Sequence, residues 1–124
     1  DGGTALMVAA TTGHKQVVNL LLRHGAEINK QNSSGDTALI GAAWEGHERV
    51  VELLLQRGAD INLQNSIGYT ALILCACQGH EPVVELLLQR GAEINKQDSK
   101  GDTALMVAAS QGHPAVVLRL LRAG

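Results

Sequence analysis

Apolar residues recur along the chain in short blocks that are separated by glycine and polar residues. Examples are Ala38–Ala43, with the sequence ALIGAA, and Val50–Leu55, with the sequence VVELLL. Gly-His stands between such blocks, and a longer loop rich in Asn, Gln and Ser follows them. Glycine commonly ends a helix because it adopts the left-handed conformation at little cost. The pattern therefore predicts pairs of short helices joined by tight turns and separated by longer loops.

The blocks return at a constant interval of 33 residues. Gly-x-Thr-Ala-Leu begins at Gly2, Gly35, Gly68 and Gly101. The Gly-His pair keeps the same interval, at Gly13-His14, Gly46-His47, Gly79-His80 and Gly112-His113. Several independent markers in one register indicate a repeat protein. We expect a single domain, residues 1–124, with repeats at about 1–31, 32–64, 65–97 and 98–124.

Each copy predicts two helices with recognisable ends. The threonine of the first motif is expected to be the N-cap of the first helix, at Thr4, Thr37, Thr70 and Thr103. That helix should end at the Gly-His glycine, and the second helix at Gly25, Gly58 or Gly91. Such short helices are marginal alone, because roughly 12 to 15 residues are needed even for good helix formers. They must stack on neighbouring copies, and paired alanines such as Ala42-Ala43 permit close approach. We predict an open all-α stack.

The segment Asn32–Gln64, NSSGDTALIGAAWEGHERVVELLLQRGADINLQ, resembles an ankyrin repeat. The resemblance covers the whole chain as four copies, of which the first and the last are incomplete. The proline and histidine of the family's Thr-Pro-Leu-His motif are absent from every copy. The resemblance implies an all-α ankyrin-repeat solenoid of helix-turn-helix units with short hairpin loops. It also implies a non-catalytic module that binds a partner protein or peptide in a concave groove.

Positions that differ among the copies are not required by the scaffold. They lie in the loop before the first helix, which includes Gly3 in the first copy, and in the last two residues of that helix. The resemblance implies that both regions line the concave groove. Trp44 occupies the position held by Thr11, Cys77 and Ser110 elsewhere, so we expect it on this groove. The alternative is that Trp44 lies flat on an adjacent copy and shields it.

We expect an apolar patch in the middle of the groove. Trp44, Ile67 and Tyr69 are large and apolar at positions that are small or polar in other copies, and Cys77 joins them. Polar residues would surround this patch: Asp36, Glu45, Gln78, Lys100, Asp102 and Gln111. An aromatic centre with a polar rim is typical of a binding hot spot. The acidic members favour a partner with basic side chains.

Composition narrows the function classes. The net charge of -2 and the pI near 6.2 provide no basic patch, so nucleic acid is not an expected partner. The longest apolar run, Ala71–Cys77, is far shorter than the roughly 18 to 20 residues of a membrane span. Cys75 and Cys77 point to different faces of a helix and would not form a disulfide, which favours an intracellular, cytoplasmic or nuclear protein. A monomer is expected.

No grouping of side chains indicates catalysis, a metal or a cofactor. The repeated histidines are expected about 10 Å apart, so they cannot share one ion. We expect them instead to form hydrogen bonds at the start of each second helix. His24 is expected to be a solvated residue at a helix end. In some ankyrin proteins, hairpin asparagines matching Asn29, Asn62 and Asn95 are hydroxylated, but bracing of their own turn is the favoured interpretation here.

Two other functions remain open from the sequence. The close likeness of the copies is compatible with a structural spacer, or with a designed or duplicated scaffold that has no natural ligand. The chain could also be the recognition segment of a larger signalling protein. In the fourth copy, Leu118-Arg119 reverses the polar–apolar order of Glu52-Leu53. An arginine there is expected to form a polar end cap on a terminal unit.

Overall fold

The computed structural model describes residues 4–124, so Gly3 lies outside the described residues. Within residues 4–124 the chain forms eight α-helices and no β-strand. They are arranged in pairs, one pair in each 33-residue copy. The helices are α1 (Ala5–Thr12), α2 (Lys15–Arg23), α3 (Ala38–Glu45), α4 (Glu48–Gln56), α5 (Ala71–Gln78), α6 (Glu81–Gln89), α7 (Ala104–Gln111) and α8 (Pro114–Ala123).

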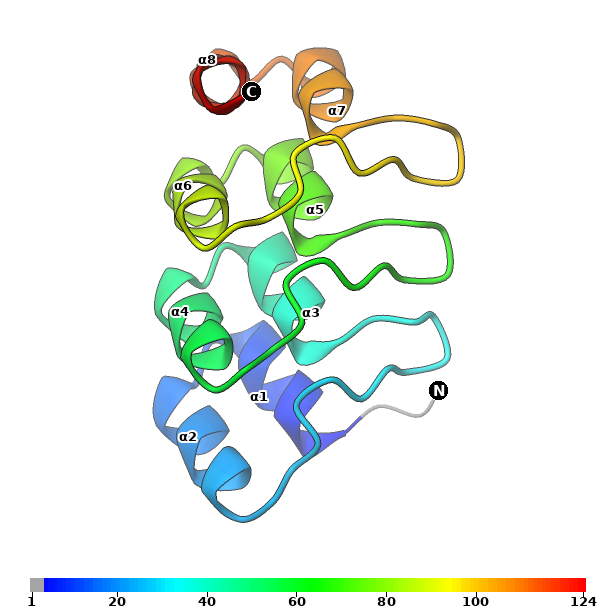
Figure 1. Ribbon diagram of the computed structural model, residues 1–124. Helices are drawn as coiled ribbons and strands as arrows, with labels where there is room; N and C mark the ends of the chain where they lie inside the picture. The colour runs from blue at the N-terminus through cyan, green and yellow to red at the C-terminus, as the bar shows by residue number, and fades with distance from the viewer. Residues whose placement is uncertain (1–3) are drawn as a thin grey trace.

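The pairs stack in two rows, as Figure 1 shows. Helices α1, α3, α5 and α7 form one row, and each contacts the next member of that row. Helices α2, α4, α6 and α8 form the second row in the same manner. The connecting loops extend away from the second row, beyond the first. The all-α stack expected from the repeat is therefore confirmed.

The expected ends of the first helices are confirmed. In every copy the threonine hydroxyl accepts a hydrogen bond from a backbone N–H three residues on, as Thr37 does from Ile40 at 3.2 Å. The Gly-His glycines adopt left-handed conformations, such as φ 78° at Gly46. The second helices end earlier than expected: α4 stops at Gln56, two residues before Gly58. Gly58 follows the C-cap residue, where its positive φ lets the chain turn back on the helix.

Burial shows that each pair depends on its neighbours. Ala42 and Ala43 of α3 are fully buried between the adjacent helices of the first row. Val50 of α4 is only 1% exposed, whereas Val17, its counterpart in the first copy, is 46% exposed. At the other end, Ala109 is exposed although its counterparts are buried. Helical stability thus comes from contact between copies, as expected for helices of eight to ten residues.

The repeated histidines connect successive copies. His47 Nε2 lies 2.9 Å from the carbonyl oxygen of Thr11, and His80 Nε2 lies 2.9 Å from that of Trp44. His113 is bonded in the same way to the carbonyl of Cys77, at 2.8 Å. We had expected these side chains to bond at the start of their own helices, and the structure corrects this expectation. Each ring reaches back to the end of a first helix, where carbonyl groups lack a partner within the helix.

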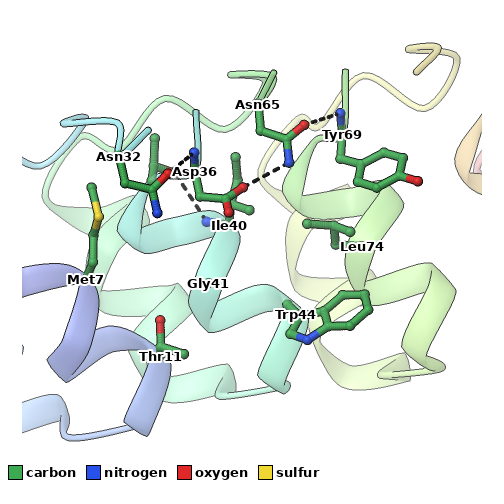
Figure 2. Close-up of a pocket in the computed structure, with 11 residues that line it drawn as sticks. Met7, Thr11, Asn32, Asp36, Ile40, Gly41, Trp44, Asn65, Tyr69 and Leu74 are labelled. Carbon is green, nitrogen blue, oxygen red and sulfur yellow. Dashed lines mark hydrogen bonds between the residues drawn. The ribbon is translucent and has the colours of Figure 1, made fainter. Parts of the chain in front are cut away.

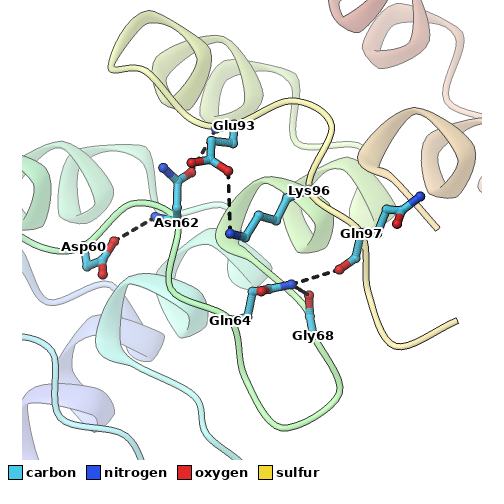
Figure 3. Close-up of polar contacts among 7 residues, drawn as sticks. All are labelled: Asp60, Asn62, Gln64, Gly68, Glu93, Lys96 and Gln97. Carbon is cyan, nitrogen blue, oxygen red and sulfur yellow. Dashed lines mark hydrogen bonds and ion pairs between the residues drawn. The ribbon is translucent and has the colours of Figure 1, made fainter. Parts of the chain in front are cut away.

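The hairpin loops are joined by a second set of polar contacts (Figure 3). Asn62 Oδ1 accepts a hydrogen bond from the backbone N–H of Glu93 in the next copy, at 2.9 Å. Asn29 bonds Asp60 in the same way. The expectation that these asparagines brace their own turns is therefore wrong for Asn29 and Asn62. Gln64 Nε2 adds a bridge, since it donates to the carbonyls of Gly68 and Gln97.

Arg119 does not form a polar end cap. Its guanidinium lies 2.8 Å from Glu81 and 2.9 Å from Glu85, both on α6, the neighbouring helix of the second row. The hydrogen bond to Glu81 raises the pKa of Arg119 above its ordinary value. The reason is positional. The counterpart Leu53 is buried, whereas Leu20 in the first copy is 54% exposed, so this position faces the preceding copy and an arginine here also faces backward. The counterpart Glu52 faces the following copy, where it pairs with Arg90. Leu118 lies on the same face, which no further copy covers within residues 4–124, and it is 48% exposed.

The histidine contact predicts a steric coupling between Gly46 and His80. A Cβ added to Gly46 would lie 2.7 Å from His80 Nδ1, in addition to the left-handed φ that disfavours any side chain. We expect Gly46→Ala to lower the free energy of unfolding by about 2 to 3 kcal/mol, measured by urea denaturation. In a His80→Ala background the cost of Gly46→Ala should fall to about 1 kcal/mol. Equal costs in both backgrounds would contradict the steric coupling.

Candidate functional site

A hollow of about 360 Å³ opens on the first row of helices (Figure 2). It is bounded by three copies of the repeat. Met7 and Thr11 of α1 lie on one side, and Leu74 of α5 lies on the other. Helix α3 passes between them, and the loops that precede α3 and α5 close the end nearest the hairpins. The site therefore exists only when three successive copies are stacked.

Gly41 creates the space for the hollow. Its counterparts in the other copies are Val8, Leu74 and Val107, so only α3 lacks a side chain at this position. Leu74 is 7% exposed and packs into the surface beside the hollow, whereas Val8 in the first copy is 64% exposed. The Thr11 hydroxyl approaches Gly41 so closely that a Cβ there would collide with it. Beyond this contact α3 presents no side chain, and Gly41 lines the hollow.

An aromatic wall borders the hollow. Trp44 follows Gly41 by three residues and so lies on the same face of α3, and its side chain extends toward α5. Tyr69 lies on the far side of Leu74 from Trp44, so the two rings flank the leucine (Figure 2). Trp44 is 37% exposed, and His80 bonds its carbonyl oxygen. Trp44 therefore has a fixed backbone and a ring that is available to a ligand.

A hydrogen-bonded loop pair forms the polar end of the hollow. Asn32 Oδ1 accepts from the backbone N–H of Asp36, and Asn65 Oδ1 accepts from that of Tyr69. Asn65 Nδ2 then donates to Asp36 Oδ1 at 2.9 Å, which links the two loops (Figure 2). Asp36 is half-buried. These bonds hold the carboxylate at the polar end of a hollow whose other end is lined by apolar helix residues.

The hollow unites some of the residues expected from the sequence and not others. Trp44, Tyr69 and Asp36 line it together. Ile67 is 50% exposed in the loop before α5, and its carbonyl accepts a hydrogen bond from Ser99. Cys77 is half-buried near the end of α5. Neither lines the hollow, and the same holds for the remaining expected rim residues, which are Glu45, Gln78, Lys100, Asp102 and Gln111.

Several lining residues were not expected from the sequence. Met7, Ile40 and Leu74 are apolar helix residues, and Gly41 is a glycine within a helix, so none of them stands out as a binding residue. One signal in the sequence identifies the site. Among its four equivalent positions, Gly41 is the only one without a side chain. The absence of a side chain at a position that is apolar in the other copies is thus as informative as an added aromatic ring.

The family of the chain follows from these features and from comparison. A family model for ankyrin repeats, three copies long, matches residues 1–65 and again residues 58–124. The protein therefore belongs to the ankyrin repeat family, whose members are generally non-catalytic modules for protein–protein interaction. No curated protein matches the chain. None of the helices in residues 4–124 is long and apolar enough to cross a membrane. No cluster of three or more potential metal ligands occurs in this same stretch.

The two cysteines are predicted to differ in reactivity. Cys75 is fully buried, and burial raises the pKa of its thiol well above the ordinary value. Cys77 is half-buried, and both thiols are free. Because only the thiolate reacts, iodoacetamide at mildly alkaline pH should modify Cys77 first and Cys75 only after unfolding. Mass spectrometry with a Cys77→Ser control checks this order, and rapid modification of Cys75 in the native protein would contradict it.

Gly41 is predicted to cost stability. Glycine within a helix is less stable than alanine by about 0.5 to 1 kcal/mol. Gly41→Ala alone should recover less than this, because the new Cβ meets the Thr11 hydroxyl. In a Thr11→Ala background, Gly41→Ala should raise the free energy of unfolding by the full amount. Urea denaturation of the four proteins measures both values, and identical gains would show that Thr11 does not restrict the position.

Proposed function

We propose that the protein binds a partner protein or peptide through its concave groove, with the hollow over Gly41 as the central contact. The observation that carries this proposal is that α3 alone in the first row lacks a side chain at the position of Gly41, and the hollow opens there. A large exposed aromatic side chain, Trp44, stands at the edge of the hollow. Binding hot spots commonly combine an aromatic anchor with a pocket that a partner side chain fills.

The scaffold supports such a role energetically. The cap, histidine and hairpin bonds hold the lining residues in place before a partner arrives. A surface that is already ordered loses little conformational entropy on binding. The proposed module acts as a monomer inside the cell, without a cofactor, and performs no catalysis. The rim residues expected from the sequence, including Glu45, Lys100 and Asp102, would make peripheral contacts with the same partner.

A second candidate function is that of a spacer or scaffold without a ligand. The near identity of segments such as LLLQRGA at Leu53 and Leu86 favours this alternative. A spacer, however, has no use for a glycine that weakens α3 and opens a hollow beside Trp44. The likeness of the copies explains the regular parts of the stack and leaves this irregular part without a reason.

Substitutions in the hollow separate binding from folding. Trp44→Ala should reduce capture of a partner from cell extract by at least about tenfold. The free energy of unfolding should change by less than about 1 kcal/mol, because the ring lies outside the buried core. Gly41→Leu, which introduces the residue that the next copy carries, should also abolish capture by filling the gap. Because its Cβ meets the Thr11 hydroxyl, it is made in a Thr11→Ala background and compared with Thr11→Ala alone, and a melting curve checks that the stack still folds. Ser110→Ala, at the matching position of the fourth copy, is the control and should leave capture unchanged.

The outcome distinguishes the candidates. If the Trp44→Ala and Gly41→Leu variants capture everything that the unmodified protein captures, the chain is a spacer and the groove proposal is wrong. If Trp44→Ala lowers the melting temperature by many degrees, Trp44 is a packing residue that shields the adjacent copy.

A further inference from the structure

The hollow has a definite charge, which points to the chemistry of its ligand. Asp36 is the only charged residue among those that line it, and no lysine, arginine or histidine is present among these described residues. The other lining groups are apolar or are neutral hydrogen-bonding groups. A single negative charge therefore stands at one end of an otherwise uncharged hollow. The ligand assigned from this charge rests on the proposed groove-binding function and specifies it.

Asp36 keeps unused capacity to accept hydrogen bonds. Its Oδ1 accepts one bond, from Asn65 Nδ2 at 2.9 Å, and the backbone N–H of Asp36 is bonded to Asn32. An ionised carboxylate has about four acceptor sites, so most remain for a ligand. Both contacts restrain the residue within its loop. A donor that enters the hollow would meet a carboxylate already held in position.

The apolar part of the hollow fits an aliphatic stem. Met7, Ile40 and Leu74 provide hydrocarbon surface beside the space over Gly41, and Trp44 provides an aromatic ring at its edge. Long basic side chains bury their methylene groups against apolar surface while the charged end contacts a polar group. Arginine in particular also stacks on aromatic faces and bonds carboxylates through two N–H groups.

We propose that the hollow takes an arginine or lysine side chain of the partner, with its stem over Gly41 and its charged end at Asp36. A purely apolar side chain would suit the walls equally well. It would, however, remove water from Asp36 without replacing the lost hydrogen bonds, which is unfavourable. Charge complementarity thus selects a cationic side chain over a neutral one.

The inference is testable with short peptides, because Trp44 is the only tryptophan and reports directly on the site. The probes are acetylated, amidated five-residue peptides with arginine, lysine, citrulline or leucine at the centre of an otherwise Gly/Ala sequence. Citrulline matches arginine in shape and lacks its charge. Tryptophan fluorescence should titrate with the arginine and lysine peptides at roughly millimolar concentrations. The citrulline and leucine peptides should bind at least about fivefold more weakly.

Two variants tie the selectivity to a single carboxylate. Asp36→Asn retains the oxygen that accepts from Asn65, and it should reduce binding of the arginine peptide to the level of citrulline. Glu48→Gln removes one negative charge from the first turn of α4, which does not line the hollow, and should leave all affinities unchanged. Raising the salt concentration should weaken the arginine and lysine complexes and leave the leucine complex nearly unaffected.

Contrary results separate this inference from the proposed function. Leucine binding as tight as arginine binding, or selectivity that survives Asp36→Asn, would overturn the cationic ligand and favour an apolar one. Absence of any fluorescence response would also overturn it. In each case the groove proposal still stands if Trp44→Ala and Gly41→Leu abolish partner capture. If those variants capture as well as the unmodified protein, the proposed function itself fails.

Discussion

The whole structure depends on contact between one helix pair and the next. Helices of eight to ten residues do not persist alone in water, so each pair gains its order from burial against its neighbours. Small residues such as Ala42 and Ala43 allow this burial by bringing the first-row helices close together. His80 adds a polar connection by reaching the open carbonyl at the end of α3. The same contacts must form at every junction, and this requirement explains why the same residues return at each interval.

A repeating scaffold gives meaning to its exceptions. Where a position is set by stacking, a different residue in one copy indicates that another demand has replaced packing. Gly41 is such an exception, since glycine destabilises a helix and provides none of the apolar surface that Val or Leu provides at this position in the other copies. Arg119 is an exception of another kind, because its ion pairs with Glu81 and Glu85 compensate for a lost apolar contact. The glycine borders a hollow on the surface, whereas the arginine maintains the junction between copies.

Much of the fold was predictable because local and repeated signals agree. The threonine caps, the left-handed glycines and the stacked pairs all follow from residue type and spacing, as Thr37 and Gly46 illustrate. The site was only partly predictable. Trp44 was recognised because it adds an unusual group, whereas Gly41 was overlooked because it removes one. The backward direction of Arg119 could not be deduced from its position in the sequence, since the side of the helix that meets each neighbour depends on the angle between stacked pairs.

The contact between His80 and the carbonyl of Trp44 has a consequence for the smallest fragment that contains the complete hollow. The hollow takes side chains from α1, α3 and α5, and the backbone of its aromatic anchor is tied to the residue that precedes α6. A fragment shortened to two repeats would keep Trp44 but lose Leu74, Tyr69 and the histidine that holds the end of α3. The complete hollow thus spans more than any single repeat, since its lining residues come from three consecutive copies.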